Sequence, residues 1–82
     1  MPTALRFGKI RVVVYPNDHR PAHVHLIGPG SEAVFNLQCP TGPAELRDSM
    51  GFATQELNWY AACLQARLPM LCETWTTIHG HH

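Results

Sequence analysis

Three histidines lie within seven positions of the sequence, in the stretch NDHRPAHVHLIG at residues 17–28. They are His19, His23 and His25, and Asp18 and Arg20 stand on either side of the first. Imidazole exchanges protons near neutral pH and also binds transition metals, so the stretch fits two kinds of chemistry. It also fits a third role, in which the histidines only hydrogen-bond to nearby backbone and stabilise a loop.

A metal site is the first interpretation. Residues i and i+2 of a strand point to the same side, so His23 and His25 can converge on one ion. A third ligand would come from the preceding loop, as either His19 or Asp18. This is a partial ligand set rather than a full motif, so the sequence favours no cofactor. Zinc or another divalent metal at His19, His23 and His25 is kept as an alternative.

Acid–base catalysis without a metal is the second interpretation. One histidine would accept the 2′-hydroxyl proton of RNA, and another would protonate the leaving oxygen. A guanidinium from Arg11 or Arg20 would stabilise the charged phosphate. The candidate catalytic residues are His19, His23, His25 and Arg20. Whether the chain is an enzyme stays open at this point.

The first half of the chain predicts the strands that must position these side chains. Segments 3–7, 9–15, 23–27 and 33–39 are separated by turn residues, which predicts a four-stranded antiparallel meander. Alternation along the strands places apolar residues on one side and polar ones on the other. The polar side would carry His23 and His25 together with four candidate binding residues, namely Arg11, Tyr15, Asn36 and Gln38.

The second half predicts helices that cover the apolar side of the sheet. Pro43 and Gly51 bound a predicted short helix at about 44–50. Apolar residues then recur every three or four positions, which predicts a helix over about 54–79, kinked or broken at Pro69. The predicted fold is α+β, with one face of the meander covered by C-terminal helices.

Length and charge narrow the class of protein. The 82 residues predict a single domain over 1–82. Six Lys and Arg residues balance six Asp and Glu residues, so the basic excess typical of non-specific nucleic-acid binding is absent. Hydrophobic residues make up 45% and charged residues only 15%, which favours self-association or a protein partner.

Cysteine content and hydropathy indicate a cytoplasmic location. Three cysteines without a CxxC pair argue against a disulfide framework and against a zinc finger, and favour a reducing compartment. The first 20 residues lack the apolar stretch of a secretion signal, and no apolar run is long enough to span a membrane. We therefore expect no membrane association.

The motifs also resemble those of a known family. The sequence is similar to small bacterial and phage-borne proteins of unknown function that carry N-D-H-x-P-x-H-V-H between an opening P-T-x-L-R and a later G-F. Here these elements span 2–6, 17–25 and 51–52, and a Leu/Glu/Trp pattern follows at Leu71, Glu73 and Trp75. The resemblance implies a toxin–antitoxin-like gene pair, a partner protein, and RNA or another polyanion as the target of the histidine-rich face.

The terminal helix departs from that family. The family helix is strongly charged, whereas this one has a second apolar side that includes Trp59, Cys63 and Met70. A helix that is apolar all round is usually buried. An exposed large aromatic residue is instead typical of an interface, so these three residues are the candidates for a homodimer or partner contact. A non-catalytic dimeric interaction module with structural histidines therefore stays open as an alternative function.

Overall fold

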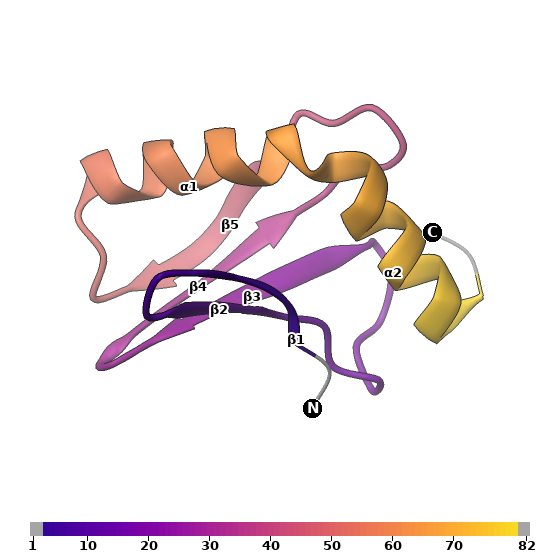
Figure 1. Cartoon of the computed structure of the whole chain (residues 1–82), viewed down its shortest axis with the longest axis horizontal. Coiled ribbons are helices and arrows are strands. Elements are labelled where there is room, and N and C mark those ends of the chain that lie inside the picture. The colour runs from indigo at the N-terminus through magenta and orange to yellow at the C-terminus, as the bar shows by residue number, and fades with distance from the viewer. Residues whose placement is uncertain (1–2, 81–82) are drawn as a thin grey trace.

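The computed structural model describes residues 3–80 as one antiparallel sheet with two helices (Figure 1). The strands and helices are β1 (Thr3–Phe7), β2 (Ile10–Val13), β3 (His23–Gly28), β4 (Ser31–Asn36), β5 (Glu45–Met50), α1 (Thr54–Ala66) and α2 (Leu68–His79). The five strands lie in chain order, each antiparallel to the next. The α+β class and the antiparallel meander are confirmed, but the predicted count of four strands was wrong. The prediction of a single domain over residues 1–82 includes positions outside the described range 3–80, so it stays a prediction.

The additional strand is the segment that the sequence predicted as a short helix. Pro43 and Gly51 bound a strand as readily as a helix, and the segment Glu45–Met50 has only two large apolar residues, Leu46 and Met50, which is too few to establish a period. β5 pairs with β4 and satisfies backbone groups that the edge of a four-stranded sheet would leave open. The helix prediction was wrong because this pairing decides the conformation, and local sequence does not reveal it.

The core forms between the apolar side of the sheet and the two helices. Val12, Val24 and Leu26 from the central strands are fully buried, and Leu64 and Leu71 cover them from the helices. Burying a side chain of this size contributes roughly 1.5–3 kcal/mol. The core rigidly fixes β2, β3 and β4, so the opposite side of these strands is a firm base for a site.

The predicted long helix is two helices that meet at Arg67. Pro69 lies in the first turn of α2, where its missing N–H would have no helical acceptor. The chain therefore breaks here, where a single kinked helix over 54–79 was the prediction. α1 lies across the sheet, and α2 turns down past one end of the strands (Figure 1). No helix among residues 3–80 is long and apolar enough to cross a membrane.

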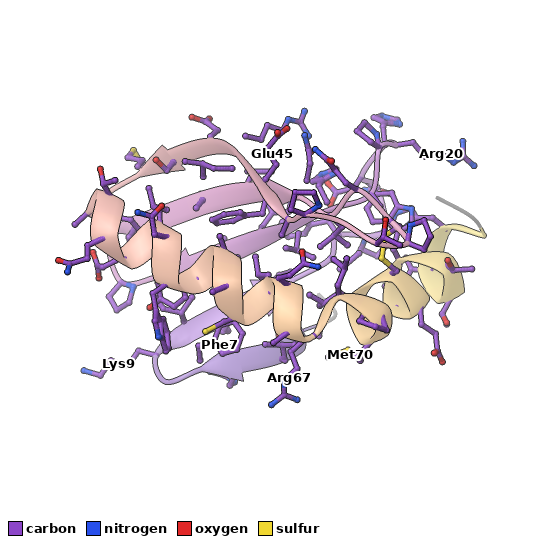
Figure 2. All side chains as sticks on the ribbon, turned by 90° about the horizontal axis from the view of Figure 1, so that it is seen from above. Phe7, Lys9, Arg20, Glu45, Arg67 and Met70 are labelled. Atoms are coloured by element: carbon purple, nitrogen blue, oxygen red, sulfur yellow. A yellow bond between two sulfur atoms is a disulfide. The ribbon has the colours of Figure 1, made fainter. Side chains whose placement is uncertain are left out.

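A disulfide fixes α2 to the segment that follows β4. It joins Cys39 to Cys72, which are 33 residues apart in sequence and 5.8 Å apart at Cα (Figure 2). The expectation of a chain without disulfides was wrong. An odd cysteine count only requires one thiol to be left over, and that thiol is the half-buried Cys63. The pairing depends on tertiary contact rather than on spacing.

Candidate metal centre

A turn before β3 aims one carboxylate at two histidines. The Asp18 N–H donates to the Tyr15 carbonyl at 3.0 Å, and the Tyr15 N–H donates to Asp18 Oδ2 at 3.2 Å. These reciprocal bonds close the turn and fix the Asp18 side chain. His23 and His25 lie at alternate positions of β3 and therefore point to the same side. Local backbone geometry thus positions all three groups.

The three side chains converge on a small volume. Asp18 Oδ2 lies 3.2 Å from His25 Nε2 and 3.4 Å from His23 Nε2. One ligand atom from each of the three residues lies within 4.8 Å of the other two. Ligand atoms about 2.0–2.1 Å from a tetrahedral zinc ion are about 3.3 Å apart. The carboxylate-to-imidazole distances match that separation.

The other nitrogen of each ring faces an oxygen. His23 Nδ1 is 2.8 Å from the Pro21 carbonyl, and His25 Nδ1 is 3.9 Å from Glu32 Oε2. His25 Nδ1 is buried and lacks a hydrogen-bond partner. Metal-binding histidines usually donate the N–H that does not face the metal to a carbonyl or carboxylate. Both rings therefore direct Nε2 inward, and His23 has the full orientation of a metal ligand, with Nδ1 bonded to an acceptor.

Aromatic packing holds the two rings in place. The Tyr15 ring meets the His25 ring edge-on with centroids 4.7 Å apart, and the two imidazole centroids are 5.2 Å apart. On its other side, His23 contacts the Trp75 ring at 5.3 Å. His23 is only 5% exposed, so this part of the polar sheet face is covered rather than open.

The site lies at the base of a cleft of about 360 Å³. The cleft is lined by Asn17, Asp18, His19, Arg20, His23, His25, Val34, Arg47 and Asp48. Arg47 and Asp48 are neighbours on β5, and neighbouring strand residues normally point to opposite sides. Here the pairing shifts between Val34 and Phe35, so Arg47 is the extra residue of a β-bulge. The bulge allows both charged side chains to line the cleft.

The predicted catalytic residues divide into two groups. His23 and His25 come together with Asp18, whereas His19 and Arg20 are exposed and line the cleft from the loop. Among the described residues, the geometry therefore makes Asp18, rather than His19, the third candidate ligand. The sequence had left both open, because a loop residue cannot be placed from strand alternation.

The predicted binding residues do not form one surface. Tyr15 contacts His25, but Arg11 is half-buried within β2 and does not line the cleft. Asn36 and Gln38 line a separate hollow with Pro21, Ala22 and Cys39. Two cleft residues, Arg47 and Asp48, were missed, because the segment that carries them was predicted to be helical.

The predicted interface residues are at least partly accessible. Trp59 is 58% exposed and Met70 is 38% exposed, while Cys63 is half-buried. The Trp59 ring also contacts Phe7 at 6.2 Å and Tyr60 at 5.1 Å, so part of it packs within the chain. Self-association through this side of the helices stays a prediction.

Comparison with protein families matches residues 10–76 to a domain of unknown function, DUF4160. The chain belongs to the DUF4160 family. The match begins at β2 and ends within α2, so it includes the disulfide and every residue of the candidate metal centre. No curated protein and no solved structure matches this DUF4160 chain significantly.

Proposed function

We propose that this DUF4160 domain binds a divalent transition metal, with zinc the first candidate, through Asp18 Oδ2, His23 Nε2 and His25 Nε2. The convergence of these three atoms supports the proposal more than any other observation. Two imidazoles and one carboxylate suit zinc and other first-row metals, whereas magnesium and calcium prefer oxygen ligands throughout.

The hydrogen-bond arrangement of His23 supports a cation at this point. A neutral imidazole has one N–H. In His23 this N–H is on Nδ1 and donates to the Pro21 carbonyl oxygen at 2.8 Å. The lone pair of Nε2 then faces the Asp18 carboxylate at 3.4 Å, which is repulsive. A metal ion between the two atoms removes the repulsion. A doubly protonated His23 would also remove the repulsion, and zinc titration tests whether a metal can take that position.

An open coordination position suits a reactive metal better than a structural one. Three protein ligands leave a fourth tetrahedral position, which catalytic zinc sites fill with water or substrate. The ligands lie in a cleft that Arg20 and Arg47 also line. Guanidinium groups bind phosphate and carboxylate groups bidentately, so the cleft suits an anionic ligand such as an RNA phosphate.

Metal-free acid–base catalysis fits the geometry less well. That mechanism needs two imidazoles at separate points on a substrate, one to accept a proton and one to donate it. Here both Nε2 atoms are directed at a single oxygen of Asp18. The arrangement therefore favours a shared cation over two independent proton-transfer groups.

The toxin–antitoxin-like role and the partner protein implied by the resemblance stay predictions, and so does the cytoplasmic location. A direct test of the partner is co-purification with the product of the neighbouring gene.

Calorimetric titration of the metal-free protein with zinc tests the proposal. All variants carry His81→Ala and His82→Ala, so that these two imidazoles cannot bind zinc. We expect one zinc ion per chain. We also expect His25→Ala to weaken binding by more than the roughly 10–100-fold typical of changes around a metal site. His19→Ala is the matched control and should bind as the parent does. A parent without zinc binding, or equal losses in the two variants, would contradict the proposal.

A further inference from the structure

We infer that the Cys39–Cys72 disulfide regulates the affinity of the metal centre by holding Trp75 against His23. This inference rests on the proposed metal-binding function. Breaking the bond would loosen the support of one ligand while leaving all three ligands present.

The Cys39 end of the bond lies beside the segment that orients His23. The Leu37 N–H donates to the Ala22 carbonyl at 2.9 Å, and Ala22 immediately precedes His23. The carbonyl of Pro21, one residue earlier, is the acceptor for His23 Nδ1. Cys39, Pro21 and Ala22 also line one hollow. The disulfide is therefore attached close to the backbone that sets the angle of the His23 ring.

The Cys72 end of the bond lies one helical turn from Trp75. Residues three apart on a helix share a face, so Cys72 and Trp75 both point toward the sheet. Trp75 is fully buried, and its ring is 5.3 Å from that of His23. The His79 ring also stacks on the Trp75 ring, with centroids 3.8 Å apart. Trp75 is thus a positioning residue for His23, and the disulfide sets the distance of α2 from the site.

Reduction would loosen α2 without detaching it. A dithiol supplies two electrons and two protons, so the S–S bond breaks, two thiols form and the dithiol becomes a disulfide. Leu68, Leu71 and the fully buried Trp75 stay in the core and hold α2 on the sheet. What the helix loses is the covalent restraint on how closely Trp75 packs against His23. A less restrained His23 lowers metal affinity because the ring must be ordered when the ion binds.

Cobalt(II) is the probe, since its visible absorption reports the coordination geometry directly. Cobalt affinity is measured for oxidised protein, for dithiol-reduced protein freed of dithiol by anaerobic gel filtration, and for the double variant Cys39→Ser, Cys72→Ser. The double variant has no new thiolates that could bind cobalt. Every protein carries His81→Ala and His82→Ala. Cys63→Ser, oxidised and reduced, is the matched control, because it removes a thiol but keeps the disulfide.

We expect affinity to fall about tenfold in the reduced protein and in the double variant, with an altered visible spectrum. Cys63→Ser should match the parent in each redox state. Trp75→Phe keeps the bond but reduces the contact, and it should reproduce part of the spectral change in oxidised protein.

Three results would overturn the inference. The first is equal affinity and spectrum in oxidised and reduced protein, which leaves the proposed metal site standing. The second is a Trp75→Phe spectrum identical to that of the parent, which removes the route through His23. The third is loss of helical circular dichroism on reduction, which shows general unfolding instead of local loosening. A failure of the oxidised parent to bind cobalt or zinc would instead contradict the proposed function itself.

Discussion

The carboxylate of Asp18 lies 3.2 Å from Nε2 of His25, although the two residues belong to different structural elements. A loop residue and a strand residue are brought together because the Tyr15–Asp18 turn folds the loop back onto β3. The same Asp18 oxygen is 3.4 Å from Nε2 of His23. One carboxylate oxygen therefore lies close to both histidines, so substitution of Asp18 is the most direct test of the site.

Asp18→Asn should abolish most of the metal affinity while preserving the fold. The amide has nearly the same shape as the carboxylate but lacks its charge, which is the main attraction for a dication. We expect zinc binding to weaken roughly 100-fold or more, measured by calorimetry or by competition with a chelator. Asn17→Ala changes a neighbouring cleft residue and serves as the control. Unchanged zinc affinity in Asp18→Asn would rule out Asp18 as a ligand.

Glu32→Gln should weaken metal binding less than loss of a ligand does. Glu32 Oε2 is 3.9 Å from His25 Nδ1, whose hydrogen bond is otherwise unmade. In the metal-bound state this carboxylate would accept the Nδ1–H and increase the basicity of the ring. We expect a loss of about tenfold in zinc affinity. Glu73→Gln, on the exposed side of α2, should leave the affinity unchanged, and equal effects of the two substitutions would contradict the assignment.

Arg47→Gln should weaken the binding of an anion to the metal-loaded protein. The bulge in β5 directs this side chain into the cleft, where a guanidinium beside a dication attracts phosphate. We expect phosphate affinity to fall about fivefold to tenfold, with zinc affinity nearly unchanged. Arg6→Gln, on the exposed side of β1, controls for the loss of one positive charge. Parallel losses in both variants would mean that only net charge matters.

Loss of the Cys39–Cys72 bond should lower stability even without metal. The bond joins residues 33 positions apart and so lowers the conformational entropy of the unfolded chain. For a loop of this length the effect raises the free energy of unfolding by about 3–4 kcal/mol. Urea unfolding of the double serine variant and of the parent measures the difference. Cys63→Ser should change the free energy of unfolding by far less. A double variant as stable as the parent would show that strain in the folded state offsets the restriction.

Gly51→Ala should destabilise the connection between β5 and α1. The residue has a φ of +84°, and a Cβ there would lie 2.5 Å from the Gly30 carbonyl oxygen. We expect a loss of about 2 kcal/mol or more in the free energy of unfolding. Gly8 has a φ of +61° but open space around its Cβ position, so Gly8→Ala isolates the backbone effect at about 1 kcal/mol. Equal losses at the two positions would argue against the clash with Gly30.

Local patterns predicted most of the sheet but not its last strand. Alternation in β2, β3 and β4 correctly divided the core from the histidine side, because the period of a strand is fixed by its covalent geometry. The helical spacing of Leu64, Leu68 and Leu71 was equally informative. β5 was missed since its conformation depends on pairing with β4, which a six-residue segment does not encode locally.

The candidate site could be predicted only in part for the same reason. His23 and His25 were identified because they share one strand, where i and i+2 positions have a known relationship. Asp18 and His19 could not be ranked, since the loop path depends on hydrogen bonds to Tyr15. The Cys39–Cys72 bond and the contact of Trp75 with His23 join distant parts of the chain. Neither has a signature in spacing.

The bulge at Arg47 gives β5 a second residue on the cleft side. In a regular strand Arg47 and Asp48 would face opposite sides of the sheet, and only one of them could line the cleft. The extra residue lets both of them line it. All six residues of β5 are exposed, so Arg47 and Asp48 can be replaced without removing a buried side chain. This wall of the cleft is therefore open to substitution at little cost in core packing.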